Sequence, residues 1–258
     1  MSKDNMGQYD GNGKDKNGLE DNVVSLSDHK KRKKPSNKPE ISPSDLPLKQ
    51  PSSEPFITLP KGVQALLGLL LFVHIGLWGL SQFSTTDYTY VAILNWGFIP
   101  ARFSGDFYFL PITVLTPITY ALFHGGWLHI IMNSVMLMAF GSGFEKIFGV
   151  KKMMIVFWGS TVIAALVHFL LDPHSMSPMI GASGGVSGLF AGMILVMHKT
   201  GRLGPSKRLF PVIAVFVGIS VVFGFMGGPD GSIIAWAAHI GGFLGGLGIV
   251  HLLLKKGA

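Results

Sequence analysis

The sequence predicts an all-α protein that crosses a membrane several times, and three observations lead to this prediction. Of its 258 residues, 48% are hydrophobic and only 14% are charged, whereas about 25% of the residues in a soluble domain are charged. The mean hydropathy is positive, at +0.44. Long apolar runs recur after residue 60, and each approaches the ~20 residues that a membrane-spanning helix needs.

Residues 1–58 are predicted to be a disordered, basic, cytoplasmic tail, because this segment has too few apolar residues to form a core. Its "HKKRKK" run, residues 29–34, is typical either of a tail held near anionic lipid or of a nucleic-acid-binding segment; membrane spans beside it favour the lipid bilayer as partner and argue against nucleic acid. No apolar stretch follows the first residues, so the tail does not resemble a signal peptide. The chain has no cysteine, which excludes disulfides and a thiol nucleophile.

The remainder, residues 59–258, is predicted to be one six-helix membrane domain. Apolar segments of spanning character lie at 63–80, 128–140, 153–171, 183–197, 209–226 and 233–254. A long connection, residues 81–126, contains "NWGFIPARF". It is too long for a turn and too apolar for a solvated linker, so we expect a structured first loop in the outer leaflet.

The basic residues predict the orientation of these spans. With six spans, one side of the membrane receives only Arg102, and the other side receives the remaining Lys and Arg residues of the domain. The positive-inside rule then places both termini in the cytoplasm and the first loop outside. A bacterial inner membrane is expected rather than an organelle, because the N-terminus lacks the acid-poor amphipathic pattern of a transit peptide.

Glycines surround one serine at the start of the fourth predicted span. In "GASGGVSG", residues 181–188, Ser183 precedes an apolar run of about fifteen residues, so it should lie below the outer surface. The glycines allow a tight turn that exposes a hydroxyl at a helix N-terminus. The alternative is a small-residue face for helix packing, to which Gly184 would contribute.

A histidine in the last predicted span can reach the same depth. His239 lies about two turns into that span, within "AWAAHIGGFLGGLG", and an ionisable residue inside a span is a functional candidate. A neutral imidazole can accept the serine proton and return it to a leaving group. Gly242 and Gly246 form a GxxxG packing motif. The alternative for His239 is a structural hydrogen bond to a neighbouring carbonyl.

A third motif, "HGGWLHIIMN", begins at His124. His129 and Asn133 are four residues apart and would share one helix face, where their donors can stabilise an oxyanion together with the Ser183 amide. A metal pair of His124 and His129 is the competing interpretation, but a spacing of five is poor for a helix and no HExxH motif or carboxylate completes a site.

No Asp or Glu lies within the six predicted segments, so a serine hydrolase here must use a Ser-His dyad rather than a triad. Other histidines carry less weight and are interpreted as satisfied or snorkelling side chains: His74, His168, His198 and His251.

The three motifs, in this order and over the whole apolar block, make the chain resemble the rhomboid intramembrane serine proteases. The resemblance implies that Ser183 is the nucleophile and His239 the general base and acid. It also implies an oxyanion hole of His129, Asn133 and the Ser183 amide, with His124 and Gly181 supporting the site, and packing of the sixth span on the fourth through Gly242 and Gly246. Two features depart from the family's pattern. Ser187 stands where an aromatic residue often stacks on the catalytic histidine, and Trp96 and Arg102 do not form the frequent adjacent Trp-Arg pair.

The expected function is therefore that of an endopeptidase that cleaves transmembrane segments of single-span membrane proteins, through an acyl-enzyme and without a cofactor or metal. The site would open to the outer side of the membrane. The rivals are a non-catalytic rhomboid-like protein that binds or escorts membrane helices, and a small transporter. A transporter should show internal repeats and a coupling residue near the midplane, and no convincing repeat is visible.

Overall fold

The computed structural model of the chain describes residues 59–202, 209–226 and 236–255. The predicted basic tail, residues 1–58, lies outside the described residues. The described part is helical, and its β-structure is limited to an isolated bridge between Phe98 and Met179.

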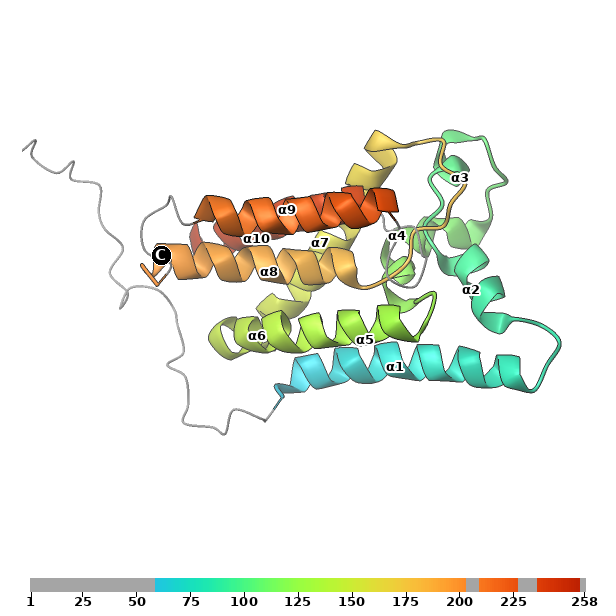
Figure 1. Cartoon of the computed structure of the whole chain (residues 1–258), viewed down its shortest axis with the longest axis horizontal. Helices are drawn as coiled ribbons and strands as arrows, with labels where there is room; N and C mark the ends of the chain where they lie inside the picture. The colour runs from blue at the N-terminus through green and yellow to red at the C-terminus, as the bar shows by residue number, and fades with distance from the viewer. Residues whose placement is uncertain (1–58, 203–208, 227–235, 256–258) are drawn as a thin grey trace, which may run out of the picture. The chain divides into compact units, whose positions relative to one another are not determined.

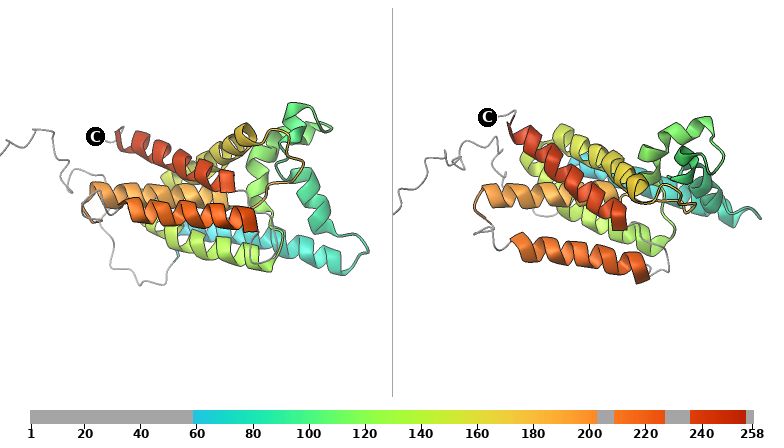
Figure 2. Two further views of the ribbon diagram at one scale, coloured as in Figure 1. Left: turned by 45° about the horizontal axis from the view of Figure 1, so that its top comes forward. Right: turned by 90° about the horizontal axis from the view of Figure 1, so that it is seen from above.

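The long helices form a bundle (Figures 1 and 2). They are α1 (Lys61–Gln82), the continuous run of α5 (Trp127–Met136), a π-helical turn η3 (Leu137–Gly141) and α6 (Ser142–Phe148), then α7 (Val150–Leu171), α8 (Ser183–Lys199), α9 (Leu209–Met226) and α10 (Trp236–Lys255).

Four helices in the described part are long and apolar enough to cross a membrane: α1, the run from Trp127 to Phe148, α7 and α10. The fourth and fifth predicted segments are also helices, α8 and α9, and α8 has 17 residues. The six-span count itself stays a prediction.

Buried residues on α1 recur at helical spacing, which shows how the bundle is built. Val63, Leu66, Leu67 and Leu70 join a core that also receives side chains from α5 to α8 and from α10. The opposite face of α1 is apolar as well, and there Phe72 is 76% exposed. A helix that is apolar all round suits a lipid environment.

The connection between α1 and α5 contains short helices, as its composition predicts: α2 (Tyr88–Trp96), α3 (Ala101–Ser104), η1 (Pro111–Leu115), α4 (Thr116–Thr119) and η2 (Tyr120–Leu122). They lie at the end of the bundle where α8 begins (Figure 1). Their expected place in the outer leaflet stays a prediction.

The second span was predicted to end too early, and the longer helix contains a buried carboxylate. The helix continues beyond residue 140 to Phe148 and includes Glu145. This buried carboxylate accepts hydrogen bonds of 2.9 Å from the backbone N–H groups of Gly62 and Val63. These N–H groups are unpaired within α1 because they lie in its first turn, so Glu145 caps α1 from a neighbouring helix and has no part in the site below.

Candidate active site

A left-handed glycine starts the fourth long helix. Gly181 has φ +105°, a conformation that side chains with a Cβ rarely adopt, and its N–H donates to the carbonyl of Tyr120 over 3.0 Å. Helix α8 begins two residues later, at Ser183. The serine therefore lies at a helix N-terminus, where backbone N–H groups have no partner within the helix.

The side chains of Ser183 and His239 meet between α8 and α10. The distance from Ser183 Oγ to His239 Nε2 is 2.9 Å, which is within hydrogen-bond range. The two residues are 56 positions apart in the sequence, and both are half-buried. Within the described ranges no carboxylate forms a hydrogen bond or ion pair with His239, so the pair resembles a dyad.

Glycine-to-backbone contacts hold α8 and α10 at this separation. A Cβ on Gly242 would lie 2.1 Å from the carbonyl oxygen of Gly184, and a Cβ on Gly246 would lie 2.2 Å from that of Gly188. Both distances are shorter than any non-bonded contact between carbon and oxygen, so only glycine fits at these positions. The small residues of the GxxxG motif thus bring the two backbones together, and the serine and histidine are carried on the same two helices.

His129 and Asn133 lie together on α5 and face the turn before Ser183. The Cβ position of Gly181 is 2.6 Å from Nε2 of His129 and 3.8 Å from Nδ2 of Asn133. The Asn133 amide donates to the His129 carbonyl over 3.0 Å. An amide group has two N–H donors, and this bond uses only one of them.

His124 lies behind His129. Its side chain is 1% exposed, and its ring centroid is 4.9 Å from that of His129. In the described part of the chain, no three metal-ligating side chains are arranged to hold a metal ion. His124 thus packs against the predicted oxyanion residues rather than against the Ser-His pair.

The two departures from the family's pattern have visible counterparts in the structure. Ser187 is buried on α8, so a small polar side chain occupies the position of the frequent aromatic residue. Arg102 is 2% exposed, and its guanidinium lies over the rings of Phe107 and Tyr108, 5.4 and 5.0 Å from their centroids. Arg102 therefore packs against loop aromatics rather than against Trp96.

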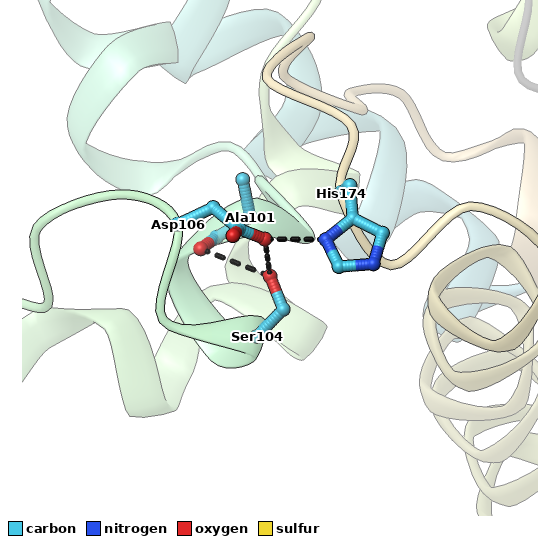
Figure 3. Close-up of polar contacts among 4 residues, drawn as sticks. All are labelled: Ala101, Ser104, Asp106 and His174. Carbon is cyan, nitrogen blue, oxygen red and sulfur yellow. Dashed lines mark hydrogen bonds and ion pairs between the residues drawn. The ribbon is translucent and has the colours of Figure 1, made fainter.

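The loop that leads into Ser183 is tied to the first long connection. Phe98 and Met179 exchange two backbone hydrogen bonds, and Ala101 N–H donates to the Ser175 carbonyl. Nearby, Nδ1 of His174 lies 2.5 Å from Oδ2 of Asp106, which also accepts from the Ser104 hydroxyl (Figure 3).

Sequence reasoning missed two residues next to the site. His74, interpreted as a satisfied or snorkelling side chain without a role in the site, is buried and in ring contact with His124 and Trp127. Its spacing from Val63, Leu67 and Leu70 places it on the buried face of α1, and this spacing could have predicted its burial. Tyr120, whose hydroxyl donates to the Thr161 carbonyl beside Gly184, gave no such signal.

The fold and this site define an α-helical protein with a serine at a helix N-terminus and a histidine partner on a glycine-rich helix. Comparison with known proteins supplies the family. The rhomboid domain model matches residues 112–256, more than half of the chain. The chain belongs to the rhomboid family and is an integral membrane protein.

Several relatives carry rhomboid names. RHOMBOID-like protein 5 of Arabidopsis thaliana is 34% identical over 134 residues, which are 50% of this chain and 41% of the relative. The putative rhomboid protease YdcA of Bacillus subtilis is 27% identical over 146 residues, 55% of this chain and 67% of the relative. The rhomboid protease GluP of the same organism is 28% identical over 134 residues, 52% of this chain and 24% of the relative. The chain thus spans well under two thirds of the first and third of these relatives.

Proposed function

We propose that this protein is an intramembrane serine endopeptidase that cleaves transmembrane segments of single-span membrane proteins. The observation that supports it most strongly is the 2.9 Å approach of Ser183 Oγ to His239 Nε2 at the N-terminus of α8. Nucleophile and base must lie within hydrogen-bond reach for this chemistry. Relatives named as proteases support the same activity at the level of the family.

In the proposed mechanism, Ser183 Oγ attacks the carbonyl carbon of the scissile peptide while His239 Nε2 takes the hydroxyl proton. The tetrahedral intermediate collapses as the C–N bond breaks, and His239 returns the proton to the leaving amine. Water then attacks the ester carbon and gives a proton to His239, which passes it to Ser183 Oγ as the C–Oγ bond breaks. The products are an amine and a carboxylic acid.

The oxyanion of both intermediates would be bound by donors from two helices. The Ser183 backbone N–H lies at the start of α8, and His129 and Asn133 face the adjacent Gly181 from α5. Donors that are fixed before the reaction stabilise developing charge without reorganisation. Gly181 would have to remain glycine, because a Cβ would meet the His129 ring.

The substrates that we propose follow from the location of the site in a membrane protein. An intact helix hides its carbonyls in hydrogen bonds, so a substrate segment must unwind locally before attack. We propose single-span proteins with small or helix-breaking residues at the cleaved position. We further propose that the site opens to the outer side of a bacterial inner membrane, with both chain termini cytoplasmic, as the basic residues indicate.

The rival function is a non-catalytic protein that binds or escorts membrane helices. It is favoured by one observation: Ser187 stands at the position where the family often has an aromatic residue that stacks on the catalytic histidine. The rival keeps the fold but requires no reactive serine.

Cleavage of a single-span reporter by purified protein in detergent tests the proposal. Ser183→Ala and His239→Ala should each reduce cleavage by about 10⁴-fold or more, because the two side chains act as a unit. Ser187→Ala, a matched change one turn along α8, should leave most of the cleavage and the labelling by a fluorophosphonate. A wild type that neither cleaves nor reacts with the fluorophosphonate, although folded, would favour the escort function.

A further inference from the structure

Four lysines lie at one corner of the bundle, at the end away from the start of α8 (Figure 1). They are the first residue of α1, one residue in the last turn of α6 and two residues in the first turn of α7: Lys61, Lys146, Lys151 and Lys152. Helix α1, the run that ends with α6, and α7 are each long and apolar enough to cross a membrane. Lysines at the ends of such helices lie at the level of the lipid headgroups.

Packing brings these three helix ends together. Gly149 alone joins α6 to α7. A Cβ on Gly62, the neighbour of Lys61, would lie 2.6 Å from Cγ2 of Val150 and 2.8 Å from Oε2 of Glu145. The first turn of α1 therefore lies against the connection between α6 and α7, and the four lysines form one group. We call this group the lysine corner.

The lysine corner keeps a net positive charge. Among the described carboxylates, Asp87 and Asp106 lie in the connection between α1 and α5, and Asp172 follows the far end of α7. Glu145 is at the corner, but it is buried and its two oxygens accept backbone N–H groups of α1. Within the described ranges no lysine forms an ion pair. Like charges that are grouped without a counter-charge attract an anion.

The side chains of the corner are accessible, and the surface next to them is apolar. Three of the four lysines are exposed, and Nζ of the half-buried Lys152 lies 5.8 Å from the centroid of the Phe148 ring. Exposed apolar residues follow Lys151 at helical spacing on the same face of α7: Ile155, Val162 and Leu166. A phospholipid has the same order of parts, with a charged phosphate above apolar chains.

Two alternatives use only part of this arrangement. A soluble phosphate would use the charge but not the apolar face of α7. A solvated face that only orients the spans, as the positive-inside rule describes, requires no group of lysines on three packed helix ends. Lys199 and Arg202, at and just after the end of α8, offer a comparison for this second alternative, because they carry two positive charges outside the lysine corner.

We propose that the lysine corner binds the headgroup of an anionic phospholipid, whose acyl chains lie along the apolar face of α7 that begins at Ile155. The ammonium groups donate hydrogen bonds to phosphate oxygens, and basic groups between spans are suited to such headgroups. The site is on the membrane domain and is separate from the lipid attraction predicted for the basic tail. It does not rest on the proposed protease function.

A bound lipid stabilises the folded protein, because a ligand that binds the folded state in preference to the unfolded state raises the unfolding temperature. The first test is thermal unfolding of the full chain in a neutral detergent with added phosphatidylglycerol. The unfolding temperature should rise by about 4 °C or more. Phosphatidylcholine, which carries the same phosphodiester but no net charge, should give a much smaller rise. An equal rise with both lipids overturns recognition of the anionic headgroup.

Three double variants test the location of the site. Lys151→Gln with Lys152→Gln should lose more than half of the rise caused by phosphatidylglycerol, whereas Lys151→Arg with Lys152→Arg should keep it. Lys199→Gln with Arg202→Gln removes the same charge outside the lysine corner and should also keep the rise. The basic run at 29–34 is present in every variant, so its attraction for anionic lipid is common to all. An equal loss in the two glutamine variants, or no loss in the first, overturns the site.

Two further measurements separate lipid binding from folding and from soluble phosphate. Native mass spectrometry of wild type, with both lipids present at equal concentration, should show phosphatidylglycerol retained in preference to phosphatidylcholine, and the preference should fall in Lys151→Gln with Lys152→Gln. This result does not depend on the stability of the variant, and equal retention of the two lipids by wild type contradicts the proposal. Inorganic phosphate at millimolar concentration should leave the unfolding temperature unchanged. If it raises this temperature as much as phosphatidylglycerol does, the corner binds soluble phosphate and the lipid site is overturned.

Discussion

The α8–α10 contact and the α1–α5 contact join helices in opposite ways. Between α8 and α10 the backbones touch through Gly184, Gly188, Gly242 and Gly246, without room for a single methyl group. Between α1 and α5, large rings stand edge to face, and a cavity of about 220 Å³ lies beside them.

The two contacts differ because they meet different requirements. Proton transfer between Ser183 and His239 needs the two side chains within hydrogen-bond reach, and the backbone contacts at the glycines hold their two helices at that separation. The rings between α1 and α5 make no backbone contact, and the cavity beside them leaves room for side chains to shift. The difference predicts that substitutions of similar size will have unequal effects in the two regions.

The largest effect is expected at the tight contact. Gly242→Ala should reduce reporter cleavage by about 10²-fold or more, because its methyl group would meet the Gly184 carbonyl and displace His239 from Ser183. Gly248→Ala is the matched control on the same helix, since nothing lies within 4 Å of its Cβ position. Fluorophosphonate labelling and reporter cleavage measure both variants. Normal activity in Gly242→Ala would show that α8 and α10 can move apart without loss of cleavage. The α8–α10 contact would then be no more sensitive to substitution than the α1–α5 contact.

A smaller effect, on stability rather than chemistry, is expected where α6 caps α1. Glu145→Gln keeps the shape of the side chain but replaces two charge-assisted hydrogen bonds to Gly62 and Val63, so the free energy of unfolding should fall by about 1–3 kcal/mol. Ser183 labelling at low temperature should be unchanged, because Glu145 has no contact with the dyad. Thermal unfolding in detergent measures the loss.

The control for this substitution is the exposed neighbour Lys146. Lys146→Gln removes a charge next to Glu145 without touching α1, and its unfolding temperature should match wild type. An equal fall in unfolding temperature in both variants would mean that the charges on α6 stabilise the protein, rather than the hydrogen bonds between Glu145 and α1.

The smallest effect is expected at the exposed pair of Asp106 and His174 (Figure 3). The hydrogen bond from Ser104, and secondly that from His174, hold the pKa of the Asp106 carboxyl below its ordinary value of 3.8. A lowered folded-state pKa means that this contact stabilises the loop above pH 3.8 and that the stabilisation is lost as the pH falls through the folded pKa.

Two variants sharpen this prediction. Ser104→Ala should raise the pKa of Asp106 more than His174→Ala does, because Ser104 is the larger cause of the shift; a carbonyl-carbon NMR titration gives both values. Cleavage near neutral pH should be almost unchanged in both, since exposed ion pairs contribute little. If His174→Ala instead raises the pKa of Asp106 more than Ser104→Ala does, His174 rather than Ser104 is the main partner of this carboxylate.

Several features of this protein could be predicted from the sequence because they depend on local pattern. Hydropathy alone predicts the long helices, and α7, α8 and α9 begin and end within a few residues of the predicted segments. The order of the three motifs predicts the family, and the family model confirms it. Ser183 and His239 could be singled out because a hydroxyl among glycines and an imidazole within an apolar run are both rare in a span.

Other features were decided only by tertiary structure, because they depend on distances between segments far apart in the sequence. The second span extends to Phe148, and there Glu145 pairs with Gly62 in the first turn of α1, 83 residues away from it. The ring contacts of His124 with His74 and with His129 exist because α1 packs beside α5. The 2.9 Å between Ser183 and His239 depends on glycine contacts that a hydropathy pattern cannot distinguish from ordinary packing. The sequence by itself determined which residues lie in the membrane domain. Helix packing decided which of them are in contact, because contacts between side chains require distances of a few ångströms in space, and a pattern along the chain does not give these distances.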